Sequence, residues 1–368
     1  MADYINNSSE TLLKVEHLCQ YFGFNKAVDD VSFEIKKGEV FGLVGESGCG
    51  KTTTGRSIIR LYNITSGNIY FKGKRIAAGT LSYKRAIKKA ESDLKEYVKQ
   101  CKAENRPDAA DLIAKKTLET KNFINEQKAE IKLAVKDHKH LDKKLVTKIQ
   151  MIFQDPIASL DPRMTVRDII AEGLVINGMK DKELIDQKVF EVLETVGLVK
   201  EHASRYPHEF SGGQRQRIGV ARAVIMEPEL IIADEPVSAL DVSIQAQVIN
   251  LLNDLRDKLG LTILFIAHDL SVVKYFSDRI GVMYFGKLVE LADADELFKN
   301  PLHPYTQSLL SAIPLPDPDY EKQRQRIVYN KLAAHDYSKE APTLREIKPG
   351  HFVDCNTEEY EKYLTMLK

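Results

Sequence analysis

The sequence predicts an α/β fold whose core is a parallel β-sheet. Residues 229–234 and 261–268 form short apolar runs, which are typical of strands buried on both faces. Each run ends in a polar residue. These runs alternate with segments of helical character, for example 165–205, and such alternation favours a parallel sheet. A Lys-rich segment at 78–148 differs in composition from its surroundings and predicts an inserted helical hairpin.

Length and composition limit the classes of protein to which the chain can belong. It has 368 residues, enough for a full core and for more than one folding unit. Lys plus Arg and Asp plus Glu each number 53, so the overall charge gives no reason to expect nucleic acid. The four cysteines lie too far apart in the sequence for a zinc or redox pair, which fits a reduced, cytosolic location. The apolar runs are of strand length, so a role at a membrane would need other chains to hold the protein there.

The N-terminal part carries the pattern of half-buried strands. Residues 12–18 and 31–35 alternate between apolar and polar, as strands do when one face is buried. Residues 38–45 predict a buried strand that ends at a glycine-rich loop, and a helix should begin at Lys51. A turn and a further strand are predicted at 66–74.

Two apolar sets recur at helical spacing within the Lys-rich segment. The sets are Leu94, Val98 and Cys101, followed by Ile124, Ile131 and Val135. Pro107 breaks a helix and Asp108 can cap the next one, so we expect two helices joined by a turn. Basic residues outnumber acidic ones here, and the simplest interpretation is a solvated insertion that projects from the core. A docking role for the hairpin is the alternative.

The segments after the hairpin return to strand character and end in a tail. Residues 148–154 predict another strand. Residues 300–319 are rich in proline and open a tail of low periodicity.

The stretch GESGCGKTTT at 45–54 has the composition of a phosphate-binding loop. Its first eight residues match G-x-x-x-x-G-K-[ST] between a predicted strand and a predicted helix, which is the context that this motif requires. Glycines let backbone N–H groups turn inward around phosphate oxygens, and the start of the helix adds partial positive charge. Lys51 should reach the β- and γ-phosphates of a nucleotide, and Thr52 should ligate Mg²⁺. The predicted nucleotide-binding residues are Gly45, Glu46, Ser47, Gly48, Cys49, Gly50, Lys51, Thr52 and Thr53. A glycine-rich turn without a ligand is the alternative, which the complete motif disfavours.

The segment LIIADEP at 230–236 supplies the acidic groups that such a nucleotide site needs. A buried strand delivers Asp234 to the Mg²⁺ shell. Glu235 follows immediately and is placed to orient or deprotonate an attacking water. An apolar run followed by Asp-Glu is weak evidence for a nucleotide site on its own, because many strands end in acidic residues. Together with the glycine-rich loop upstream it predicts hydrolysis of a nucleoside triphosphate.

The segment FSGGQRQR at 210–217 is a second candidate anion-binding loop before a helix. Its residues are Ser211, Gly212, Gly213 and Gln214. With this segment the sequence resembles the ATP-binding subunits of ABC transporters, in which SGGQ is the signature. The resemblance implies a RecA-like parallel core, an antiparallel β subdomain, a helical signature subdomain, and ATP with Mg²⁺ as cofactors. It also implies that two subunits pair head to tail, so that Ser211 and Gly213 contact the γ-phosphate of ATP held by the partner.

Other elements of the family occur in the expected order. Gln154 in MIFQD resembles the Q-loop glutamine, which would ligate Mg²⁺ and lie near the transmembrane subunits, and Asp241 in SALD resembles the D-loop at the dimer interface. His268 in IAHD resembles the switch histidine that senses the γ-phosphate, although a lone His after a strand is more often structural. Tyr21 or Phe22 resembles the aromatic residue that stacks on adenine, with Phe22 preferred, although an aromatic residue at a strand end is more often part of a core.

Two stretches narrow the resemblance to the F-type ATP-binding subunit of oligopeptide and dipeptide importers. They are QMIFQDPIASLDPRMTV at 150–166 and HPYTQSLLSAIPLPDP at 303–318. This implies two transmembrane permeases, a D-type sibling ATPase in a head-to-tail heterodimer, an extracellular substrate-binding protein, and no nucleic acid. The chain would then lie peripherally at the cytoplasmic face of a bacterial membrane. Import of nickel or another small solute is an alternative, because related systems carry such solutes.

The sequence departs from the family pattern in two places. The insertion at 78–148 is longer than the usual link before the Q-loop, so the resemblance says nothing of its role. The tail holds only Cys355, so we expect no iron–sulfur centre of the kind that some D-type siblings carry.

A DNA-repair or chromosome-organising ATPase is the competing interpretation, because these proteins also place a coiled coil before the signature. Here the hairpin is short, precedes Gln154 and lacks a C-x-x-C hook.

The expected organisation has four segments, which are an N-terminal β subdomain with the phosphate loop, the hairpin, the remainder of the ATPase, and an importer-type extension. Their ranges are 10–77, 78–148, 149–290 and 291–368.

Overall fold

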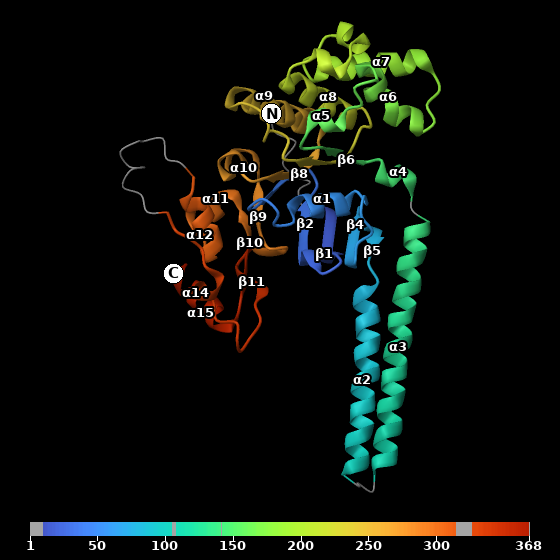
Figure 1. Cartoon of the computed structure of the whole chain (residues 1–368), viewed down its shortest axis with the longest axis vertical. Helices are drawn as coiled ribbons and strands as arrows, with labels where there is room; N and C mark the ends of the chain where they lie inside the picture. Colours follow the sequence, from blue (N-terminus) through green and yellow to red (C-terminus); the bar gives the residue numbers. More distant parts are fainter. Residues whose placement is uncertain (1–9, 105–107, 141, 314–325, 368) are drawn as a thin grey trace.

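Two sheets form the centre of the protein, and helices extend from them at opposite ends. The computed structural model describes residues 10–104, 108–140, 142–313 and 326–367. The strand order is β2-β1-β4-β5 in the smaller sheet and β11-β12-β10-β9-β3-β8-β7-β6 in the larger one. Figure 1 shows helices α5 to α8 beyond one side of the sheets and the long pair α2 and α3 projecting from the other.

The smaller sheet is antiparallel and packs on the larger one. Its strands are β1 (Thr11–Phe22), β2 (Asn25–Lys36), β4 (Ser66–Phe71) and β5 (Lys74–Ala78). Residues such as Val15 and Ile35 on its inner face share one core with Phe41 and Leu43 of the larger sheet. The predicted strands at 12–18 and 31–35 are therefore confirmed, although both are longer than the alternating pattern indicated.

The larger sheet is parallel at its centre, as the buried apolar runs predicted. Its parallel strands are β3 (Val40–Val44), β6 (Ile149–Ile152), β7 (Leu230–Asp234), β8 (Thr262–Ala267) and β9 (Arg279–Tyr284). Alternate residues of β3 serve two cores: Phe41 and Leu43 face the smaller sheet, while Val40 and Val44 join the core that the helices cover. Such two-sided burial requires the continuous apolar sequence that these strands have.

Helices pack on the larger sheet and extend beyond it. The helices α1 (Lys51–Ile58), α10 (Leu270–Phe276) and α11 (Ala294–Lys299) contact its strands, whereas α4 (Lys143–Val146) directly precedes β6 and α9 (Val242–Leu259) follows β7. The separate helical layer contains α5 (Pro156–Ser159), α6 (Val166–Ile176), α7 (Lys182–Thr195) and α8 (Gly212–Val224), with short 3₁₀ turns at Lys200–Ser204 and Pro207–Glu209. Side chains at Thr165 and Asp181 cap α6 and α7, because each accepts a hydrogen bond from a backbone N–H of the first turn.

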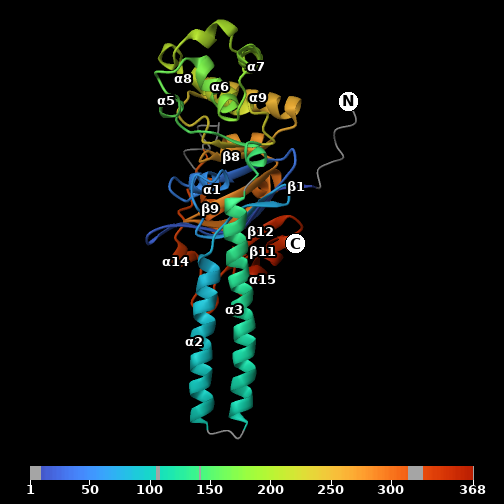
Figure 2. The ribbon, with the colours of Figure 1, turned by 90° about the vertical axis from the view of Figure 1, so that its right-hand side faces the viewer.

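The Lys-rich insertion forms a hairpin of two long helices, α2 (Leu81–Ala103) and α3 (Ala109–Lys139). Figure 2 shows both running side by side away from the sheets, so the predicted projecting hairpin is confirmed. The predicted apolar face was wrong at one position: Val135 is 44% exposed, whereas Ala134 is 1% exposed. Asp108 stands at the start of α3, but its side chain makes no capping hydrogen bond. Pro107 lies outside the described residues.

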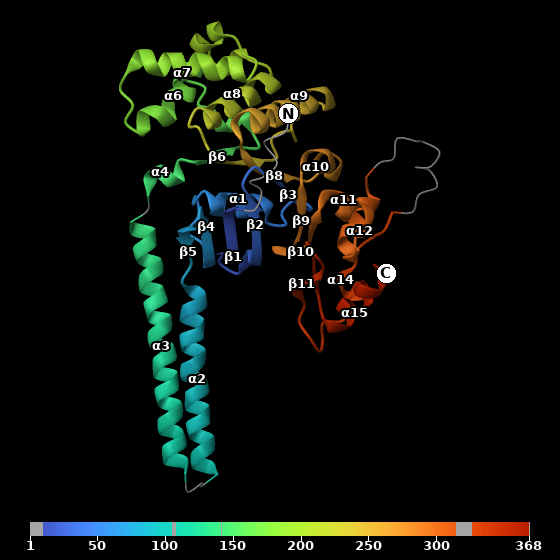
Figure 3. The same ribbon diagram turned by 180° about the vertical axis from the view of Figure 1, so that it is seen from behind.

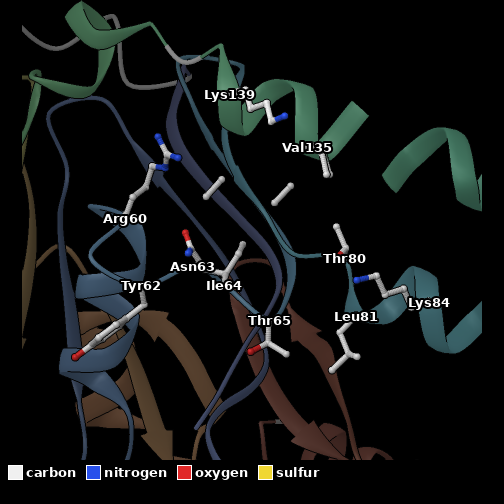
Figure 4. Close-up of a pocket in the computed structure, with 13 residues that line it drawn as sticks. Arg60, Tyr62, Asn63, Ile64, Thr65, Thr80, Leu81, Lys84, Val135 and Lys139 are labelled. Carbon is white, nitrogen blue, oxygen red and sulfur yellow. The ribbon is translucent and has the colours of Figure 1, made fainter. Parts of the chain in front are cut away.

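The hairpin is tied to the smaller sheet at its base. Arg75 of β5 donates from Nε to Asp137 Oδ2 over 2.8 Å, and its guanidinium lies 3.7 Å from Glu130, both on α3. A pocket of about 290 Å³ remains between hairpin and core, lined by Lys84 of α2 and by the segment after α1, including Asn63 (Figure 4). The base is therefore joined by these polar contacts and by packing around a cavity, in which Ala134 is buried.

The tail contains regular structure, which the sequence pattern did not predict. Strand β10 (Lys287–Asp293) precedes the tail, whose elements are α12 (Pro304–Ser311), α14 (Lys331–Ala334), β11 (Thr343–Lys348), β12 (His351–Cys355) and α15 (Thr357–Met366). Strand β12 pairs with β10, so the tail extends the larger sheet. Its short strands bury few residues, chiefly Ile347, Val353 and Cys355, and so carry little periodicity. Among the described residues, no helix is both long and apolar enough to cross a membrane.

Candidate functional site

The glycine-rich loop joins β3 to α1, and its conformation requires glycine at two positions. Gly45 has a φ of +145°, and a Cβ there would lie 2.2 Å from the carbonyl oxygen of Met283. Gly50 has a φ of +111°, and a Cβ there would lie 2.3 Å from the carbonyl oxygen of Ala27. The backbone is thus held between β9 and the β1–β2 hairpin in a shape that other residues cannot adopt.

Lys51 lies beneath this loop with its ammonium group turned back toward the loop. Its side chain is 3% exposed, and Nζ donates to the carbonyl oxygens of Gly45 at 2.7 Å and Glu46 at 3.0 Å. Ser47 and Gly48 are exposed at the tip, whereas burial raises the pKa of the Cys49 thiol. Cys49 therefore acts as an apolar support under the loop.

Thr52 and Asp234 meet as the sequence predicted for the metal position. Thr52 Oγ1 donates to Asp234 Oδ1 over 2.7 Å. Burial raises the pKa of Asp234, and the Thr52 hydrogen bond opposes that shift. The second carboxyl oxygen, Oδ2, is buried without a hydrogen-bond partner, although buried polar atoms are nearly always paired.

This pair fits Mg²⁺, which takes one or two protein ligands and completes its shell with phosphates and water. Within the described residues, no group of three or more His, Cys, Asp and Glu side chains could hold a metal ion. Thr52 and Asp234 therefore form a ligand set of the size that a nucleotide-bound Mg²⁺ takes.

Glu235 is the point at which three of the predicted residues converge. Gln154 donates from Nε2 to its Oε2 over 2.9 Å, and His268 Nδ1 lies 3.2 Å from the same oxygen. Lys51 Nζ is 4.0 Å from Oε1. These residues follow β6, β8 and β3, which run parallel, so their carboxyl ends share one edge of the sheet. Gln154 was also predicted as a metal ligand, but here its amide N–H group points to Glu235.

The backbone at Glu235 has a strained conformation. Its φ is +44°, in the left-handed region that non-glycine residues rarely adopt. Its N–H still donates to the carbonyl oxygen of Ile266 over 2.9 Å. Strain of this kind costs about 1–3 kcal/mol and is typical of functional positions.

The signature segment forms the start of α8, in the helical layer. Ser211 caps the helix: its Oγ accepts from Gln214 N, and Gln214 Oε1 accepts from Ser211 N. Ser211 and Gly212 are exposed, while a Cβ at Gly213 would lie 2.5 Å from Ile244. Figures 1 and 3 place α8 apart from α1, so the structure does not bring the signature to Lys51 of the same chain.

Asp241 and Thr53 take positions at the starts of two helices. Asp241 caps α9 by accepting from Ile244 N over 3.0 Å, and it is exposed. Thr53 lies half-buried in the first turn of α1, next to Thr52.

The two adenine-stacking candidates lie in different environments. The Tyr21 hydroxyl donates to Asp29 Oδ1 over 2.5 Å. Phe22 is 46% exposed and meets the ring of Tyr62 edge-on at 5.2 Å. The more exposed ring of Phe22 is therefore the better candidate, in line with the sequence-based preference.

Sequence reasoning missed Tyr305, which touches the glycine-rich loop. Its hydroxyl accepts a hydrogen bond from Glu46 N over 3.1 Å, although 259 positions separate the two residues. Tyr305 lies inside the stretch at 303–318 that carries the importer resemblance, but no local pattern indicated this contact.

Comparison with known proteins agrees with this geometry. The ABC transporter family matches at residues 28–131 and 110–238, and the C-terminal region of oligopeptide/dipeptide transporters matches at 289–339. The chain belongs to the ABC transporter family. Its activity is ATP hydrolysis, and ATP is its cofactor.

Similar proteins are known from several bacteria. The oligopeptide transport ATP-binding protein OppF of Bacillus subtilis is 54% identical over 360 residues, covering 96% of this chain and 99% of the relative. OppF of Streptococcus mutans is 50% identical, covering 92% and 91%. The dipeptide transport ATP-binding protein DppF of Lactococcus lactis is 48% identical, covering 94% and 93%.

Solved structures confirm the fold of this ABC cassette. The structure of cbiO1 from Clostridium perfringens, part of the ABC transporter complex cbiONQ, matches with a TM-score of 0.56 at 23% identity, covering 79% of this chain and 92% of that one. MJ1267, an ATP-binding cassette of an ABC transporter, matches in its ADP conformation with a TM-score of 0.55 at 22% identity, covering 80% and 96%.

Proposed function

We propose that the chain is the ATP-hydrolysing motor subunit of a membrane importer for oligopeptides or dipeptides. The observation that carries this proposal is the match of residues 289–339 to the C-terminal region of oligopeptide/dipeptide transporters. Relatives named as oligopeptide or dipeptide transport proteins cover almost the whole chain, insertion included. These similarities favour peptides over nickel and disfavour a DNA-associated ATPase.

The residues of the site have distinct roles in this proposal. Lys51, with the loop N–H groups, binds the β- and γ-phosphates, and Glu235 orients the attacking water and takes its proton. Gln154 and His268 hold the Glu235 carboxylate through the contacts described above. Thr52 and Asp234 would hold Mg²⁺, which supplies positive charge to the phosphates when bound. Phe22 would stack on the adenine.

The exposed signature supports pairing with a second ATP-binding subunit. Ser211 and Gly213 lie at the start of a helix that is apart from α1 and the chain's own phosphate loop, and such a start binds anions. Head-to-tail pairing with a D-type sibling would bring them to the γ-phosphate held by that sibling. Asp241, exposed at the start of α9, would lie at the same interface.

A groove between the sheet and the helical layer is the candidate docking site for a permease. It has a volume of about 420 Å³, and its lining includes Met151, Phe153 and Ile176. Ile176 is 76% exposed and adds an accessible apolar side chain to this groove. Since the groove lies beside Gln154, a bound permease could act on the catalytic carboxylate. The chain would then lie at the cytoplasmic face of a bacterial membrane, with two permeases and an extracellular binding protein completing the complex.

The four segments of the chain follow from these roles. Residues 10–77 and 149–290 form the ATPase, 78–148 is the projecting hairpin, and 291–368 is the importer-type extension. The DNA-associated alternative gives the hairpin a central role, whereas here it is peripheral.

Uptake by cells that lack this gene tests the proposal. Restoring the wild-type chain should restore uptake of a radiolabelled tripeptide, and restoring Glu235→Gln should not. A pull-down of tagged Glu235→Gln protein from membranes with MgATP should recover two permeases and a sibling ATPase. Restored uptake of ⁶³Ni²⁺ without peptide uptake would refute the substrate class, and recovery of DNA-bound partners without permeases would refute the importer.

A further inference from the structure

We propose that Tyr305 is a positioning residue for the phosphate-binding loop, so that the C-terminal extension is part of the ATP site. Its hydroxyl oxygen accepts the Glu46 backbone N–H at 3.1 Å. This inference rests on the ATPase activity of the chain and does not depend on which solute is transported.

The backbone of Glu46 is held at both its N–H and its carbonyl group. Its N–H donates to Tyr305, and its carbonyl oxygen accepts from Lys51 Nζ over 3.0 Å. Lys51 also bonds the preceding carbonyl, that of Gly45, over 2.7 Å. Tyr305 therefore fixes the part of the loop that in turn fixes the lysine ammonium group.

Tyr305 is itself held rigidly at the start of α12. His303 caps this helix, because its Nδ1 accepts from Tyr305 N over 3.1 Å, and Pro304 begins the first turn. The N–H groups of Leu302 and His303 donate to the two carboxyl oxygens of Glu290, a fully buried residue of β10. His351 of β12 also contacts Glu290, over 2.8 Å. A continuous set of polar contacts thus runs from the tail strands to the phosphate loop.

Packing fixes the direction of the Tyr305 ring. The side chain is 1% exposed, and its ring lies 4.4 Å from that of Tyr284 and 5.4 Å from that of Tyr329. Tyr284 ends β9 directly after Met283, whose carbonyl faces Gly45. Burial raises the pKa of Tyr305, so the hydroxyl stays neutral and remains available to the loop.

The substitution Tyr305→Phe tests the hydrogen bond with the ring left in place. The KM for ATP should rise about three- to ten-fold, the loss expected for one neutral hydrogen bond, with a smaller change in kcat. Hydrogen–deuterium exchange of the Glu46 amide should become faster. The matched control is Tyr329→Phe, which alters the same ring cluster away from the loop and should leave both quantities unchanged.

A second substitution removes the same bond from the donor side. Glu46→Pro has no N–H to donate, so adding Tyr305→Phe to it should raise KM no further. Additive effects, or equal shifts in Tyr305→Phe and Tyr329→Phe, would show that Tyr305 acts only through packing and would overturn the proposal. Unchanged KM and amide exchange in Tyr305→Phe would do the same. Peptide uptake by the wild type remains a separate test, so failure here leaves the importer assignment standing.

Discussion

The substitution Gly50→Ala should lower the free energy of unfolding more than a glycine-to-alanine substitution at a position where the added Cβ has no neighbouring atom. The new Cβ would lie 2.3 Å from the Ala27 carbonyl oxygen, so the β1–β2 hairpin and the loop must separate by about 0.7 Å to restore a 3.0 Å contact. Strain at a φ of +111° adds to this overlap. Together they should lower the free energy of unfolding by about 2–6 kcal/mol.

Gly260→Ala provides the matched control. Gly260 follows α9 with a φ of +65°, and a Cβ added there would have no neighbouring atom within 4 Å, so only backbone strain of about 1–2 kcal/mol applies. The assay is urea unfolding without nucleotide, followed by circular dichroism because the chain has no Trp. If Gly50→Ala lowered the free energy of unfolding no more than Gly260→Ala, the close contact with Ala27 would not hold the loop.

Three further predictions follow from the site, the hairpin and the tail. Glu235→Gln should still bind MgATP but release phosphate about 10²–10⁴-fold more slowly, because it loses its general base; near-normal turnover would remove Glu235 from the mechanism. Deleting 80–146 should leave ATP hydrolysis intact, because the hairpin is joined at its base around a cavity; loss of the folded state on calorimetry would contradict this. Burial lowers the pKa of His303 to about 3, so the unfolded chain binds a proton below pH 6.5 that the folded chain does not. The free energy of unfolding should therefore fall by up to about 1.4 kcal/mol per pH unit as the pH drops from 6.5 toward 3. His303→Asn keeps a helix cap and should flatten that slope; an unchanged slope would show that other groups cause the pH dependence of stability.

The phosphate loop and the acidic strand end could be predicted from the sequence because each is formed by residues that are adjacent in the chain and that its chemistry requires. Glycines at fixed spacing give a loop of inward N–H groups, and a buried strand that ends in Asp-Glu delivers carboxylates to its edge. Parallel strands then place Gln154, Glu235 and His268 together, since their carboxyl ends share one side of the sheet.

Other features depend on contacts between distant segments, and local patterns do not encode them. Tyr305 reaches Glu46 only because the tail folds back along β10. The tail strands are short, so alternation over a few residues is too weak to detect. The prediction for α3 was wrong at Val135, which is exposed, whereas the neighbouring Ala134 is buried. Ala134 has a small side chain, so its burial could not be recognised from the spacing of large apolar residues.

Strand β12 covers the edge of β10, and this has a consequence for any shortened form of the protein. A chain cut near residue 300 would uncover the edge of β10 at Glu290 and Leu291 and would remove the partners of the Glu290 carboxylate in the tail. Exposed edges of this kind pair readily with other chains. Shortened cassettes should therefore aggregate, and the extension protects the solubility of the ATPase.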